Sequence, residues 1–69
     1  MEKKIAEELM KEVLVLNAQI NVIIDKSEQI SSEPERREMR RHIAQVMAAS
    51  DEHLFRPILR QYPELEPHW

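Results

Sequence analysis

The first thirty residues contain a row of side chains at alternating steps of three and four positions, all apolar except Ser27, and neither proline nor glycine interrupts them. The row comprises Ala6, Leu9, Val13, Leu16, Ile20, Ile23, Ser27 and Ile30. Alternating steps of three and four residues are typical of helices that pack along one another. The spacing therefore predicts one long helix over residues 2–30, with this apolar seam facing a second helix.

The sequence Ser-Ser-Glu-Pro-Glu at residues 31–35 indicates where that second helix begins. Ser32 and Glu35 have the spacing of a capping box, in which the serine hydroxyl accepts a hydrogen bond from a backbone N–H. Pro34 falls in the first turn, where its missing N–H costs nothing. A second seam follows with Met39, Ile43, Val46, Ser50 and either His53 or Leu54. We therefore predict a second helix over residues 33–55.

Three later prolines divide the C-terminal part of the chain. Pro57 removes a backbone donor and predicts a break or kink near Phe55 and Arg56, followed by a short helical turn over residues 57–62. Pro63 and Pro67 predict an extended tail over residues 62–69.

A connection of about two residues between the long helices makes them antiparallel neighbours. The expected facing pairs are Ile23 with Met39, Ile20 with Ile43, Leu16 with Val46, Val13 with Ser50, and Leu9 with His53 or Leu54. The sequence thus predicts an all-α antiparallel helical hairpin that forms a single domain over residues 1–69.

Composition excludes several kinds of functional site. The chain has no glycine and no cysteine, which argues against glycine-rich phosphate loops, disulfides, thiolate nucleophiles and cysteine-based zinc sites. No serine stands in a recognisable catalytic arrangement with a histidine, and no metal-ligand spacing is present. We expect no enzymatic activity and no cofactor. The net charge of −3 makes nucleic-acid binding a weaker expectation.

One apolar group on the first helix lies roughly opposite the seam. A helix that is apolar on both sides is normally covered on both sides, and a domain this small rarely has a sufficient core of its own. We therefore predict a homodimer in the form of a four-helix bundle, with a dimer or partner surface at Leu14, Val15, Ala18 and Val22. The alternative is that part of the seam itself serves the dimer, with Leu14 and Val22 packed against the folded-back tail. The most apolar stretch is too short and too polar to span a membrane, so a cytoplasmic location is expected.

Four arginines form the densest charge cluster, at Arg36, Arg37, Arg40 and Arg41. Their spacing places them in two adjacent rows on a helix, where they could bind an anion, RNA or an acidic partner. The alternative is a solvated face on which Glu33, Glu35 and Glu38 form local ion pairs.

The tail contains a second candidate contact segment at Tyr62, Leu65 and Trp69. We expect it to dock on its own bundle or on the dimer mate, with disorder as the alternative. Taken together, the sequence favours a small non-enzymatic protein that self-associates and acts through protein contacts as an adaptor or regulator. The alternative is a dimeric bundle that binds RNA or an anion through the arginine rows.

Overall fold

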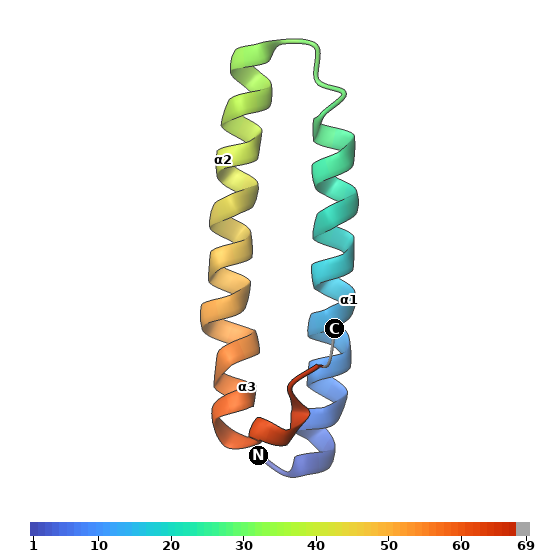
Figure 1. The fold of residues 1–69 in the computed structure, drawn as a ribbon, viewed down its shortest axis with the longest axis vertical. Coiled ribbons are helices and arrows are strands. Elements are labelled where there is room, and N and C mark those ends of the chain that lie inside the picture. The colour runs from blue at the N-terminus through green and yellow to red at the C-terminus, as the bar shows by residue number, and fades with distance from the viewer. Residues whose placement is uncertain (68–69) are drawn as a thin grey trace.

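The computed structural model describes residues 1–67, and its regular elements are all helical. Two long helices run antiparallel as a hairpin, and the chain then folds back toward its start (Figure 1). The elements are α1 (Lys3–Ser27), α2 (Glu33–Ser50), the π-helix η1 (Asp51–Phe55), α3 (Arg56–Gln61) and the 3-10 turn η2 (Pro63–Leu65). The molecule measures 46 × 18 × 16 Å. The predicted all-α class is confirmed.

Helix α1 ends at Ser27, three residues before the predicted end at residue 30, so residues 28–32 form a longer connection than the sequence indicated. The N–H groups of Gln29 and Ile30 bond to the carbonyls of Lys26 and Ser27, at 3.1 Å in both cases. Helices often end on a glycine in the left-handed conformation. This chain has no glycine, and α1 closes instead with tight bonds that span three residues.

Helix α2 begins where the capping pattern predicted. Ser32 is the N-cap, and its hydroxyl accepts a long hydrogen bond of 3.5 Å from the backbone N–H of Glu35. Pro34 occupies the first turn, and Glu33 and Glu35 place negative charge at the positive end of the helix dipole.

The predicted break or kink near Phe55 and Arg56 takes the form of a π turn, and the chain passes from α2 through η1 into α3 without leaving the helical path (Figure 1). Pro57 lacks the N–H that an unbroken α-helix would donate to the carbonyl of His53. The structure widens one turn instead, and the N–H of Arg56 bonds to the carbonyl of Asp51. Such a π turn inserts one residue into the α spacing, which changes the residues that face α1 from this point onward.

The main apolar core lies where α3 packs against the first half of α1. Its buried members are Ala6, Met10, Val13 and Ile58, with Leu14, Phe55, Leu59, Tyr62 and Leu65 packed around them. Farther along the hairpin, Ile20 and Ile43 are both buried, as expected for the predicted central pair. Val13 and Ser50 are also both buried.

The C-terminal segment is not extended throughout, since residues Pro63–Leu65 form the 3-10 turn η2. Tyr62 donates its hydroxyl to the carbonyl of Met1 at 2.6 Å, and Lys3 lies 3.3 Å from a carboxylate oxygen of Glu64. The pKa of Glu64 is held below its usual value mainly by a backbone hydrogen bond to its carboxylate within the turn. The hydrogen bond and positive charge of Lys3 lower it further. Trp69, part of the predicted docking tail, lies outside the described residues.

Candidate functional site

The apolar seam of α1 divides into two rows with different environments. Ala6, Val13, Ile20 and Ser27, spaced seven residues apart, are buried. Leu9, Leu16 and Ile23, also spaced seven apart, are 39–45% exposed. Residues seven apart lie almost above one another on a helix. The helix is therefore rotated so that one row contacts α2 and the next row borders solvent.

Helix α2 repeats this division. Ile43 and Ser50 are buried, whereas Met39 and Val46 are 41% and 55% exposed. Leu54, at 44%, stands eight residues after Val46. The π turn adds one residue to the helix, so a step of eight residues across it covers the same rotation as a step of seven elsewhere. Leu54 therefore continues the row of Met39 and Val46. We call the exposed set the seam face: Leu9, Leu16, Ile23, Met39, Val46 and Leu54. The hairpin therefore does not bury three of the predicted pairs, namely Leu16 with Val46, Ile23 with Met39, and Leu9 with His53 or Leu54.

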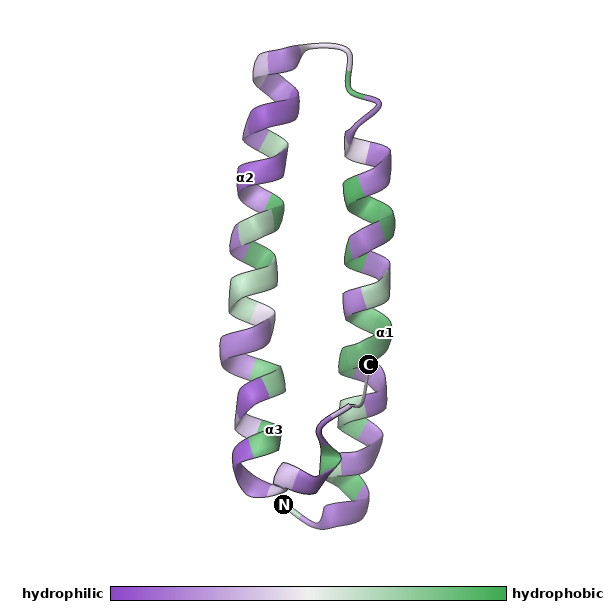
Figure 2. Cartoon of the chain, viewed as in Figure 1, coloured by the Kyte–Doolittle hydropathy of each residue, from purple (hydrophilic) through white to green (hydrophobic). Residues whose placement is uncertain are grey.

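The two helices share this face, because a shallow groove of about 150 Å³ runs between them. Ile20 and Ile43 line it together with exposed members of the seam face from both helices, namely Ile23, Met39 and Val46. His42 is the one polar residue of its lining, with Nε2 3.9 Å from a carboxylate oxygen of Glu38. Along the middle of both long helices hydrophobic residues alternate with hydrophilic ones, whereas the first turns of α2 are mostly hydrophilic (Figure 2).

The four residues of the predicted partner surface differ in exposure. Leu14 is partly buried against the core cluster. Val15, Ala18 and Val22 are exposed on α1, and Val15 reaches 62%. Their positions on the helical wheel direct them away from α2.

A second hollow, of about 270 Å³, has a more polar lining than the groove. Asn17, Asn21 and Asp51 contribute the polar groups, and Met47 and Phe55 contribute apolar surface. Asp51 accepts a hydrogen bond of 2.6 Å from Nε of Arg56. The lining of this hollow is thus mixed, whereas that of the groove is almost wholly apolar.

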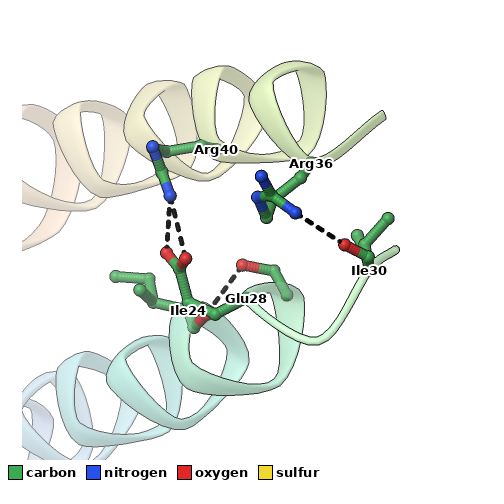
Figure 3. A network of polar contacts seen from close by, with 6 residues as sticks. Ile24, Glu28, Ile30, Arg36 and Arg40 are labelled. Atoms are coloured by element: carbon green, nitrogen blue, oxygen red, sulfur yellow. Dashed lines mark hydrogen bonds and ion pairs between the residues drawn. The ribbon is translucent and has the colours of Figure 1, made fainter. Parts of the chain in front are cut away.

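Two of the four arginines hold the connection between the long helices in place (Figure 3). Nη2 of Arg40 lies 2.8 and 2.9 Å from the two carboxylate oxygens of Glu28. Nη1 of Arg36 donates to the backbone carbonyl of Ile30 at 3.0 Å. This role was missed in the sequence because the four arginines were considered there only as a binding surface or a solvated face.

The other two arginines pair with acids on their own helix. Arg37 lies 2.6 Å from Glu33 and Arg41 lies 3.3 Å from Glu38, and all four side chains are largely exposed. Each guanidinium of the cluster therefore has an acceptor within this chain. The pairs of Arg37 and Arg41 are the local ion pairs of the solvated-face alternative, and together with Arg40–Glu28 they place a carboxylate beside three of the four guanidiniums.

Neighbouring arginines should differ in their effect on stability. We expect Arg36→Gln to lower the free energy of unfolding by about 1–2 kcal/mol, because a part-buried carbonyl loses a charged donor. Arg37→Gln should change it by less than about 0.5 kcal/mol, because an exposed ion pair contributes little. Urea unfolding of both variants at equal protein concentration measures the difference. Equal effects would contradict the assigned role of Arg36.

The described residues contain no group of three or more histidines or carboxylates placed to hold a metal ion. None of the helices in residues 1–67 combines the length and hydropathy needed to cross a bilayer. No protein-family model, curated protein or solved structure matches this chain.

Proposed function

We propose that this chain is a small non-enzymatic cytoplasmic protein that self-associates and acts through protein–protein contacts, as an adaptor or regulator. The observation that carries the proposal is the seam face. Its six apolar side chains follow the spacing of a helix–helix interface, yet each is 39–55% exposed in the single chain.

The size of the core supports the proposal. Among the described residues only six apolar ones are buried: Ala6, Met10, Val13, Ile20, Ile43 and Ile58. Fully burying one aliphatic side chain contributes about 1.5–3 kcal/mol, whereas ordering each residue of the chain costs roughly 1–2 kcal/mol in backbone entropy. A domain of this size without disulfides therefore gains much from a partner that covers more apolar surface.

Sedimentation equilibrium at micromolar concentration tests the self-association. We expect a mass of about twice the chain's 8.3 kDa, together with a melting temperature that rises with protein concentration. A species of 8.3 kDa whose melting temperature is independent of concentration would contradict the proposal.

A further inference from the structure

We propose that a second copy of this chain covers the seam face, so that the two hairpins form a four-helix bundle through Leu9, Leu16, Ile23, Met39, Val46 and Leu54. The inference rests on the proposed self-association and identifies its surface. It replaces the sequence-based choice of a surface at Leu14, Val15, Ala18 and Val22, and it develops the alternative that part of the seam serves the dimer.

The spacing of the exposed residues favours another helix pair as the occupant. Helices that pack along one another need two apolar positions in each heptad to form a continuous contact, so two rows of apolar side chains alternate along it. Within one hairpin, α1 uses the row of Val13 and Ile20 against α2. Its second row, with Leu16 and Ile23, runs in the same direction, and the described residues 1–67 leave it about two-fifths exposed. Antiparallel hairpins that share such rows build a four-helix bundle.

The area of the seam face agrees with a dimer of this chain. Its six side chains expose on the order of 500 Å², at the upper end of what ordinary monomers show as one patch. A stable interface buries about 800 Å² on each partner, and homodimer interfaces are about 65% apolar. The seam face therefore supplies nearly all the apolar area that one partner needs.

The distribution of charge favours hairpins packed with their ends reversed. Residues 1–16 and 47–67 form one end of the molecule and carry eight acidic against five basic side chains, a net charge of −3. Residues 17–46 form the other end and carry five of each, a net charge of zero. The reversed arrangement separates the two acidic ends, whereas the parallel one places them side by side.

Methionine oxidation tests the surface on the unaltered protein. Met39 belongs to the seam face and Met47 lines the mixed hollow, and their exposed fractions in the single chain are nearly equal, 41% and 44%. Treatment with hydrogen peroxide, followed by peptide mass spectrometry, reports the rate at each sulfur. In the dimer we expect Met39 to oxidise at least about fivefold more slowly than Met47, because the second copy covers it. Equal rates in a sample of dimer mass would overturn the inference.

A pair of valine substitutions gives an independent test. Val46 and Val15 are both exposed in the middle of a long helix, but only Val46 belongs to the seam face. We expect Val46→Glu to weaken dimerisation by at least about 100-fold, since a carboxylate would be buried without a partner. Val15→Glu should leave the dissociation constant within about threefold.

The outcomes separate the inference from the proposed function. A dimer that survives Val46→Glu but dissociates with Val15→Glu would place the interface on the outer side of α1 and overturn the inference, while self-association stands. A monomeric unaltered protein would overturn both. If Val46→Glu abolishes helical circular dichroism, the oxidation rates of Met39 and Met47 in the unaltered dimer decide.

Discussion

Ile20→Ala is expected to lower the free energy of unfolding by about 2–5 kcal/mol, enough to unfold much of so small a protein. Ile20 is 3% exposed and, with Ile43, lines the groove between the long helices. The truncation removes buried methyl and methylene groups and leaves a cavity that rigid helices fill only in part. Urea unfolding followed by circular dichroism measures the loss, at one fixed protein concentration because dimer stability depends on it.

Val22→Ala is the matched control, two residues away on the same helix and 43% exposed. It should change the free energy of unfolding by no more than about 0.5 kcal/mol. If both variants lose equal stability, the rotation of α1 about its axis differs from the one described.

Ile58→Ala should lower the free energy of unfolding by a similar amount, about 2–5 kcal/mol. Ile58 is 4% exposed and packs with Ala6, Met10 and Val13 of α1. Its burial depends on η1, because the extra residue of the π turn rotates α3 relative to α2. Thermal unfolding of Ile58→Ala, compared with the exposed control Arg60→Ala, measures the effect.

A stable Ile58→Ala variant would mean that α3 is not part of the core. In that case the cluster around Val13 would have to be covered by another segment. The control Arg60→Ala should unfold within about 0.5 kcal/mol of the unaltered protein.

The sequence was most informative where local chemistry decides the structure. The start of α2 follows from the cap at Ser32 and the proline at position 34, both of which act on neighbouring backbone groups. The apolar steps of three and four residues predicted two long helices. Burial of Ile20 and Ile43 also agrees with the register derived from a short connection.

Three features could not be read from the pattern. The seam spacing does not state how far each helix turns about its axis, so Leu16 and Ile23 were expected to be buried inside the hairpin. Pro57 predicted a break or kink but not the π turn that the chain forms before it. The contact of Arg36 with the carbonyl of Ile30 arises because α1 ends early.

Small-angle X-ray scattering tests side-by-side dimerisation most directly, because it reports mass and shape together. One hairpin has a radius of gyration of 14.7 Å and a longest extent of 46 Å. Two hairpins packed along the seam face, with their long axes about 10 Å apart, should double the mass. They should raise the radius of gyration only to about 16 Å. An end-to-end dimer would instead give roughly 27 Å, estimated from two rods in line. That value, or the mass of a single chain, would contradict the account.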